Sequence, residues 1–132
     1  PSLEILDTRI FRKDESTGKM RTVFDTISDN AANAGVISGV QKNDPQKFDL
    51  RRVGSIVMRN NEVEETGLGA GVLNDPITGI IWLVKRLSEY NQKISPGEII
   101  LSGSFIRPIE ARKGDEFYAD FGDFGFVECK FN

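Results

Sequence analysis

Apolar residues recur at helical spacing in a single long stretch of this chain, residues 75–90, and this pattern leaves most of the remaining sequence to extended structure. Asp75 is a suitable helix cap, and Pro76 suits the first helical position because its missing N–H would have no partner there. The apolar residues that share one face are Ile77, Ile80, Ile81, Val84 and Leu87. The spacing predicts one amphipathic helix packed on the outside of a β-rich body.

Extended segments separated by Gly, Pro, Asn and Asp make up most of the rest of the chain. Asn60 and Asn61 lie between two of them, and asparagine tolerates the positive φ that a tight hairpin turn requires. A short helix is expected between Asp25 as its cap and Gly35 as its stop. The extended segments cover residues 3–10, 35–42, 50–69, 97–104, 106–122 and 124–132. The fold class predicted is mixed α/β and rich in β structure.

Length and composition favour one soluble globular domain that covers residues 1–132. The net charge is −3 with acids and bases mixed along the chain, so no basic stripe favours nucleic acid. No apolar run reaches the ~20 residues that cross a bilayer, and no signal-peptide pattern is present, so we expect no membrane partner and a cytoplasmic location. The lone cysteine, Cys129, is expected to be a core or sheet residue without a chemical role.

The chain contains no histidine, and this absence narrows the chemistry available to it. Histidine is the commonest general base and the commonest zinc ligand in proteins. Neither a Ser-His-Asp nor a Cys-His arrangement can be completed from these residues alone. Any acid–base step must use Asp, Glu, Lys or a water activated by a metal ion.

Glu4 is an acid inside an otherwise apolar run near the start of the chain. In a strand, its side chain would share a face with Leu6 and Ile10, which favour burial. A carboxylate buried there must be paired, protonated or bound to a metal, because an isolated buried charge is costly. Arg9 lies on the opposite face with Asp7, where these two can pair with each other. Metal ligation of Glu4 is therefore a candidate, with Mg²⁺ or Mn²⁺ favoured by oxygen ligands.

Three further segments could bind a ligand, and each also has a simpler structural explanation. "FDTISDNAANAG" contains Asp29 and Asn30 and is richer in acids and amides than a plain turn, although local capping also accounts for this composition. "LSGSFIRP" places backbone N–H groups and hydroxyls near Gly103 and Ser104, where they can face an anion, and Arg107 is either a carboxylate clamp or a structural arginine. "GLGAGVL" lacks the order of a phosphate-binding loop and is interpreted as a close passage of backbone.

Taken together, four stretches resemble the C-terminal half of the hydratases of the fumarylacetoacetate hydrolase superfamily, with the likeness running from about Leu3 to Phe131. They are "LEILDTRI", "TVFDTISDNAANAGVISG", "EETGLGAGVLNDP" and "ILSGSFIRPIEARKGDEFYADFG". The resemblance implies a bent β-roll or barrel with a peripheral helix, and a divalent metal, Mg²⁺ or Mn²⁺, held by a Glu-x-Glu pair and a third glutamate. The third position maps onto Glu4.

The resemblance also implies a reaction and a division of roles. The substrate would be a small 2-oxo acid, most similar to 2-oxohept-4-ene-1,7-dioate of homoprotocatechuate catabolism, to which water is added after the metal polarises its ketone. Asp29 and Asn30 are candidates for the catalytic pocket, Gly103 and Ser104 for binding substrate oxygens, and Arg107 for the second carboxylate. The hydratases of this superfamily are about twice as long as this chain. Their Glu-x-Glu pair and a lysine near the substrate lie upstream of the residues that this chain matches.

The chain is therefore expected to be half of an enzyme that is inactive alone and associates with a missing N-terminal half or with copies of itself. Three other functions stay open. A decarboxylase of the 4-oxalocrotonate type would use the same metal and a related substrate. A C–C hydrolase acting on a fumarylpyruvate-like substrate would normally need a histidine, which the other half would have to supply. A structural or interaction fragment without activity is the remaining alternative.

Overall fold

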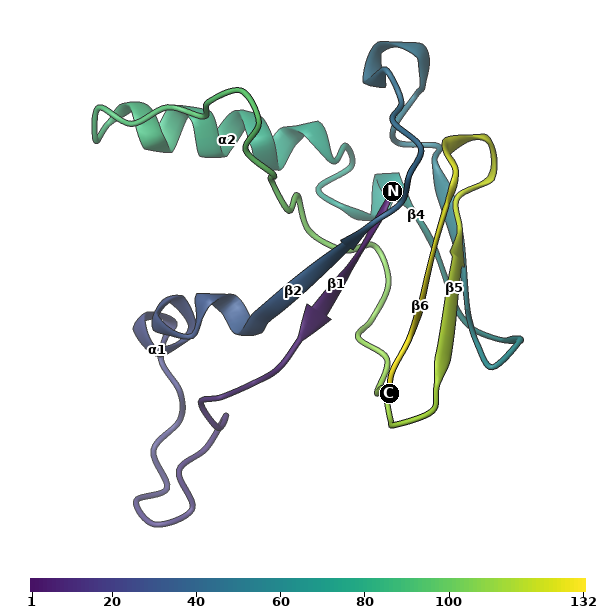
Figure 1. The fold of residues 1–132 in the computed structure, drawn as a ribbon. Helices are drawn as coiled ribbons and strands as arrows, with labels where there is room; N and C mark the ends of the chain where they lie inside the picture. The colour runs from purple at the N-terminus through teal and green to yellow at the C-terminus, as the bar shows by residue number, and fades with distance from the viewer.

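The computed structural model describes all residues 1–132 and contains two separate antiparallel sheets (Figure 1). A two-stranded sheet pairs β1 with β2, and a four-stranded sheet has the order β4-β3-β5-β6. The strands are β1 (Ser2–Leu6), β2 (Asn33–Ser38), β3 (Gly54–Arg59), β4 (Glu62–Leu68), β5 (Glu116–Asp120) and β6 (Phe126–Lys130). The β-rich prediction is confirmed, but neither sheet closes, so the chain contains no complete barrel.

Tight turns connect the strands of the four-stranded sheet. Asn60 and Asn61, at the β3–β4 hairpin, have φ of 53° and 67°, as the hairpin prediction requires. The β5–β6 connection ends at Gly125, whose φ is 106°, a value that strongly favours glycine. This sheet is therefore built from two local hairpins joined through the β3–β5 pairing.

The core of the chain lies on one face of the four-stranded sheet. Its buried members are Val57 on β3 and Phe117 and Ala119 on β5, and Val127 of β6 is also buried. The Phe117 ring packs edge-on against Phe131 with ring centres 5.6 Å apart. Partly buried side chains that cover this cluster include Leu3 of β1 and two residues of an extended segment, Ile106 and Ile109. Both β1 and the extended segment are thus attached to the same face.

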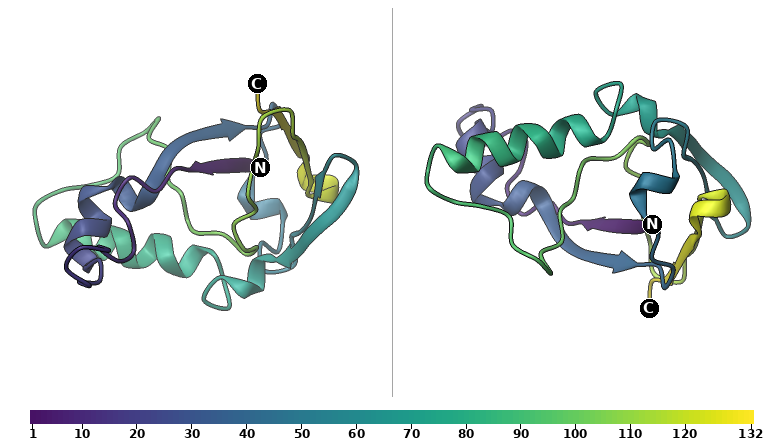
Figure 2. Two further views of the ribbon diagram at one scale, coloured as in Figure 1. Left: turned by 90° about the horizontal axis from the view of Figure 1, so that it is seen from below. Right: turned by 90° about the horizontal axis from the view of Figure 1, so that it is seen from above.

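A close approach of backbone joins the two-stranded sheet to the larger one. Gly39, just after β2, donates its N–H to the carbonyl of Pro1 at 3.0 Å. A Cβ atom on Gly39 would lie only 2.5 Å from the carbonyl oxygen of Phe126 on β6. Glycine is therefore required at this contact, which fixes one end of β1 and β2 beside β6. The β1–β2 pair extends from there toward the helices (Figure 2).

Helix α2 (Ile77–Ser88) forms within the predicted range, and the carboxylate of Asp75 accepts the N–H of Ile77 at 2.9 Å. The helix lies at the outside of the molecule, as predicted, but it is only partly covered by the rest of the chain. No residue of α2 is buried, and Trp82 remains 64% exposed. Figures 1 and 2 show α2 and α1 on the side of the molecule away from the four-stranded sheet. The apolar face of α2 is only partly covered, because Ile77, Ile80 and Leu87 are half-buried whereas Ile81 and Val84 are exposed. Neither helix is long and apolar enough to cross a membrane.

Helix α1 (Val23–Ser28) begins earlier than predicted because Thr22, not Asp25, is its cap. Asp25 occupies the third helical position and completes a capping box, since its carboxylate accepts the Thr22 N–H at 2.8 Å. Gly35 was expected to stop this helix but lies inside β2. The helix instead ends before a turn at Asn30–Ala32, whose three residues all have positive φ.

Residues 98–111 were predicted to contain a strand, but they form no sheet ladder. This segment runs as an extended chain past Gly67, where a Cβ would lie 2.3 Å from the Phe105 carbonyl oxygen. Gly69 also lies close to other backbone, because a Cβ atom added to it would be only 2.0 Å from the carbonyl oxygen of Leu50. The interpretation of "GLGAGVL" as a close passage of backbone is confirmed. The continuous apolar run at residues 99–101 favours a strand in the sequence, but no neighbouring strand of this chain lies beside it to pair.

Candidate active site

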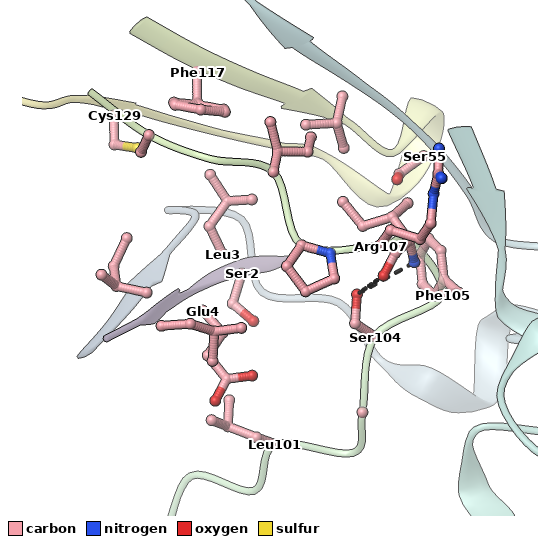
Figure 3. Close-up of a pocket in the computed structure, with 18 of the residues that line it drawn as sticks. Ser2, Leu3, Glu4, Ser55, Leu101, Ser104, Phe105, Arg107, Phe117 and Cys129 are labelled. Atoms are coloured by element: carbon pink, nitrogen blue, oxygen red, sulfur yellow. Dashed lines mark hydrogen bonds between the residues drawn. The ribbon is translucent and has the colours of Figure 1, made fainter. Parts of the chain in front are cut away.

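A pocket of about 710 Å³ lies between β1, the extended segment 100–111 and the core face of the four-stranded sheet (Figure 3). Its floor is largely apolar and includes Val57, Phe117 and Cys129. The edges are polar, with Glu4 on β1 and a serine-rich turn on the extended segment. Burial raises the pKa of the Cys129 thiol, which keeps it protonated and agrees with a packing role. An apolar cavity with a few convergent polar groups is typical of a small-molecule site.

Glu4 lines this pocket but is not buried, which corrects the sequence-based expectation. The strand ends at Leu6, so Ile10 does not lie on the same face, and Leu6 itself is 46% exposed. The carboxylate has a partner that the sequence argument missed: Oε1 accepts a hydrogen bond from Asn33 Nδ2 at 2.9 Å. The only signal for Asn33 was its place in an amide-rich stretch, because strand register cannot be read from the sequence alone.

The turn at residues 102–104 carries the predicted oxygen-binding residues to the edge of the pocket. Gly103 has φ of 103°, and both Gly103 and Ser104 are exposed. Ser104 Oγ donates to the carbonyl of Ile106 at 3.0 Å and accepts its N–H at 3.2 Å (Figure 3). The hydroxyl is thus used to hold the local turn, and the groups left to face a ligand are the backbone donors.

Arg107 also lines the pocket, where it forms an ion pair with Glu65 of β4. Arg107 Nε donates to Glu65 Oε1 at 2.9 Å, and a second guanidinium nitrogen contacts the same oxygen. The arginine side chain is 85% exposed, whereas that of Glu65 is 18% exposed. Arg107 can therefore present part of its guanidinium outward while Glu65 holds the other part.

Asp29 and Asn30 are not among the residues that line the pocket. Asp29 is buried and bound by Arg9, with Nε–Oδ1 at 2.7 Å and the Arg9 backbone N–H at 3.2 Å from Oδ2. Burial alone would raise the pKa of Asp29, but the side-chain and backbone hydrogen bonds from Arg9 outweigh it and lower the pKa. The expected pairing of Arg9 with Asp7 is replaced by this contact. Asn30 is exposed with φ of 50°.

The structure therefore brings Glu4, Gly103, Ser104 and Arg107 to one pocket and leaves Asp29 and Asn30 outside it. No group of three or more acidic, histidine or cysteine side chains in the chain is close enough to hold a metal ion. Glu4 is the acid placed at the pocket by β1. A divalent site at Glu4 would need further ligands from outside these 132 residues.

Comparison with known proteins identifies relatives along almost the whole chain. The 2-oxo-hept-4-ene-1,7-dioate hydratase of Escherichia coli is 50% identical over 131 residues, which cover 99% of this chain and 49% of that protein. The 2-keto-4-pentenoate hydratase of Paraburkholderia xenovorans is 31% identical over 131 residues and 46% of its length. This chain is homologous to one half of these hydratases. The sequence motifs predicted a resemblance to the C-terminal half of these hydratases, and this prediction is confirmed. No family model matches the chain.

Solved structures agree with this relationship to the hydratases. A 4-oxalocrotonate decarboxylase from Pseudomonas putida G7, complexed with magnesium and adipate, matches with a TM-score of 0.87 and 27% identity. The same enzyme complexed with calcium and acetate matches with a TM-score of 0.86 and 26% identity. Both matches cover 100% of this chain and less than half of the solved chain. The chain spans about half the length of the hydratases and decarboxylases that it matches.

Proposed function

We propose that these residues form the C-terminal half of a divalent-metal-dependent hydratase that adds water to a 2-oxo-alkenoate in the breakdown of aromatic compounds. The substrate proposed is 2-oxohept-4-ene-1,7-dioate, because the Escherichia coli hydratase of that name is 50% identical over 131 residues. The observation that carries the proposal is the pocket, which gathers Glu4, Gly103, Ser104 and Arg107 from separate parts of the chain.

Glu4 is the residue of this chain proposed to hold the metal ion. It is exposed at the pocket, Asn33 engages only its Oε1, and Oε2 accepts no hydrogen bond. A free carboxylate oxygen suits Mg²⁺ or Mn²⁺, and the missing half of the enzyme would supply the remaining ligands. When bound, a divalent cation polarises the 2-oxo group of a chelated substrate and favours the enone that accepts water.

The other pocket residues are assigned to holding the substrate. The backbone N–H groups of Gly103 and Ser104 are placed to donate to its oxygens. Arg107 is proposed to bind the second carboxylate of a dioate, for which it must turn part of its guanidinium away from Glu65. Catalytic roles for Asp29 and Asn30 stay a prediction, since neither reaches the pocket of this chain.

The apolar surface of the helices is proposed to contact the missing half. Phe24 of α1 is 76% exposed and Trp82 of α2 is 64% exposed, and both helices lie apart from the four-stranded sheet. Apolar exposure of this extent is typical of an interface. We assign this apolar surface to contact with the half of the hydratase that this chain does not match. Homo-oligomers are proposed to form from the complete enzyme. A cytoplasmic location stays a prediction.

A decarboxylase of the 4-oxalocrotonate type is the second candidate function. It is favoured by the two solved structures with TM-scores of 0.86 and 0.87, which are decarboxylases. The identity of 26–27% to those enzymes is lower than the 50% to the hydratase, and this difference favours hydration. A C–C hydrolase or an inactive fragment has no observation in its favour.

Mixing the two halves of the enzyme tests the proposal directly. The 132-residue chain is assayed with Mg²⁺ and 2-oxohept-4-ene-1,7-dioate by loss of the ultraviolet absorbance of the conjugated dienol tautomer, alone and after addition of the separately expressed N-terminal half. We expect turnover only on mixing, because one glutamate cannot hold a magnesium ion. Turnover by the chain alone would refute the half-enzyme assignment. Release of CO₂ in place of hydration would identify the decarboxylase.

Replacing the proposed ligand in the mixed enzyme gives a sharper test. Glu4→Ala should lower metal affinity more than about 100-fold, beyond the range typical of residues that only support a ligand. The fold should be preserved, because Glu4 is exposed and contributes nothing to the core. Glu62→Ala is the matched control, since Glu62 is an exposed strand glutamate without an ion pair. Equal Mn²⁺ affinity in the Glu4→Ala and Glu62→Ala enzymes would end the ligand assignment.

A further inference from the structure

The geometry points to Asn33 as a positioning residue that fixes the carboxylate of Glu4 for metal binding, an inference that rests on the proposed function. Asn33 begins β2, and its Nδ2 lies 2.9 Å from Glu4 Oε1 across the two-stranded sheet. This is the one side-chain hydrogen bond that Glu4 makes. Carboxylate ligands of metal ions are commonly held by such a partner, which orients one oxygen and leaves the other for the ion.

A β-bulge is what brings Asn33 to Glu4. From Ser2 to Ile5 the strands pair in regular register, with Glu4 opposite Val36 and Ile5 opposite Gly35. The register then shifts by one residue, so Leu6 pairs with Asn33 instead of Ala34. A shift of one residue moves a side chain to the other face of a sheet. Without the bulge, Asn33 would lie on the face opposite Glu4, and Ala34 would take its place.

Arg9 holds the bulged end of the strand in this register. Its Nη2 donates to the carbonyl of Asn33 at 3.1 Å and to the carbonyl of Asp29 at 2.7 Å. Its Nε donates to the buried Asp29 carboxylate at 2.7 Å. Between these contacts, Ala31 and Ala32 have positive φ, which alanine rarely adopts unless neighbouring contacts hold it. Arg9 and Asp29 thus tie the start of β2, and with it Asn33, to the chain that follows β1.

These contacts also give the ion pair between exposed Arg9 and buried Asp29 a role in the site from outside the pocket. Asp29 does not line the pocket, yet it anchors the turn that carries Asn33. Asp29 binds the Arg9 side chain, Arg9 binds the backbone carbonyl of Asn33, and the Asn33 side chain binds Glu4. Bulges are common beside active sites, where they redirect a single side chain. The bulge in this ribbon redirects an amide donor onto the proposed ligand.

The first experiment needs no metal and therefore does not depend on the proposed function. The chain is labelled with ¹⁵N, and the side-chain amide of Asn33 is observed by NMR, with the remaining half added unlabelled where it improves the spectra. We expect Glu4→Ala to move the Asn33 amide signals because their acceptor is removed. Glu62→Ala is the control and should leave them in place. Asn33 signals that do not respond to Glu4→Ala would overturn the inference.

The second experiment measures Mn²⁺ affinity of the assembled enzyme by electron paramagnetic resonance. Asn33→Ala should weaken Mn²⁺ binding about 10- to 100-fold, the range typical of residues that support a metal ligand. Asn33→Gln keeps an amide donor and should restore affinity to within about threefold of the wild type, on the same reasoning. Ser38→Ala is the control, because Ser38 is an exposed residue of the same strand without a side-chain hydrogen bond.

The two experiments separate failure of the inference from failure of the proposed function. If Glu4→Ala abolishes Mn²⁺ binding while Asn33→Ala binds like the wild type, Glu4 is a ligand and the positioning role of Asn33 is refuted. If Glu4→Ala itself binds Mn²⁺ normally, the ligand assignment and the inference fall together. A purely structural role for Asn33 predicts equal losses for Asn33→Ala and Asn33→Gln, and that result would also overturn the inference.

Discussion

The four-stranded sheet and the β1–β2 ribbon are held together by different forces. The sheet contains the buried side chains, with Val57 at 2%, Ala119 at 0% and Val127 at 2% exposure. No residue of β1 or β2 is buried. The ribbon is shaped by polar contacts, mainly Asn33 with Glu4 at 2.9 Å and Arg9 with Asp29 at 2.7 Å. Apolar burial stabilises the first region, and hydrogen bonds give the second its geometry.

This difference gives the pocket one closely packed side and one side shaped by polar contacts. A close-packed sheet provides a rigid floor for the pocket, whereas Glu4 is carried by a ribbon that contacts the sheet along one end. A two-stranded sheet is marginally stable by itself and needs further packing. Under the proposed function, the half of the hydratase that this chain does not match would supply that packing. In this view, completing the enzyme completes the metal site and stabilises the ribbon in one step.

The largest change in stability should come from emptying the core of the sheet. Phe117→Ala should destabilise the chain by about 3–5 kcal/mol, the usual cost of removing a buried phenylalanine. Phe117 is 7% exposed and packs against Phe131. Phe24→Ala on α1 is the control and should change little, because Phe24 is 76% exposed. Chemical denaturation of both variants provides the measurement. A similar loss for both would show that the core is not confined to the sheet.

The sequence predicted the sheet better than the ribbon, for a physical reason. The Asn60–Asn61 turn and the β5 and β6 segments depend on local turn chemistry and alternation, which are visible in the residues themselves. The Asn33–Glu4 contact depends on a one-residue shift in register between segments about 30 residues apart, which no local pattern records. Of the six site residues predicted from the sequence, the pocket gathers Glu4, Gly103, Ser104 and Arg107 but not Asp29 or Asn30, and the roles of all six stay predictions. Motif resemblance could not identify Asn33 or the partner of Arg9.

The helices and the extended segment 98–111 show a second limit of sequence-based prediction. The apolar pattern of α2 correctly indicated a helix but not how far its apolar face is covered, since Ile81 and Val84 on that face remain 50% and 48% exposed. The continuous apolar run at residues 99–101 indicated a strand, but this segment finds no partner to pair with. Periodicity reports which face of an element is apolar, but not whether the same chain supplies the surface that covers it.

Acid should act on the ribbon through Asp29. Its pKa is lowered from the ordinary value of 3.8, so its contribution to stability is present above that value and is lost as pH falls through the lowered pKa. The difference in unfolding free energy between the wild type and Asp29→Asn should therefore be constant near neutral pH and shrink below pH 3.8. The effect should be smaller than that of Phe117→Ala.

Hydrogen exchange locates this acid effect. Amides at the bulged end, such as those of Asp7 and Ala32, should lose protection in Asp29→Asn, while the β3 and β5 amides keep theirs. Asp115→Asn is the matched control, because the pKa of Asp115 is also lowered, first by the hydrogen bond from Asn60, but Asp115 lies beside the β3–β4 hairpin. Equal loss of protection across both regions would show that the ribbon and the sheet open together.

The smallest effect is expected at the β3–β4 turn, where two neighbouring asparagines allow a direct contrast. Asn61 has φ of 67° and makes no side-chain hydrogen bond, so Asn61→Gly should raise stability by at most about 0.5 kcal/mol, because relief of the positive φ is offset by a more flexible unfolded chain. Asn60 has a similar φ of 53°, but its side chain donates to Asp115 Oδ1 at 2.9 Å and accepts the Glu116 N–H at 3.0 Å. Asn60→Gly should therefore destabilise the sheet by about 1–2 kcal/mol.

Neither substitution at this turn should move the Asn33 amide signals or change Mn²⁺ affinity in the assembled enzyme. The turn belongs to the sheet, and the orientation of Glu4 is set by contacts within the ribbon. Thermal unfolding and the Asn33 NMR spectrum, recorded on the same two variants, make the comparison. If Asn60→Gly shifted the Asn33 signals as strongly as Glu4→Ala does, the geometry of the ribbon would depend on the sheet, and polar contacts alone would not account for the position of Glu4.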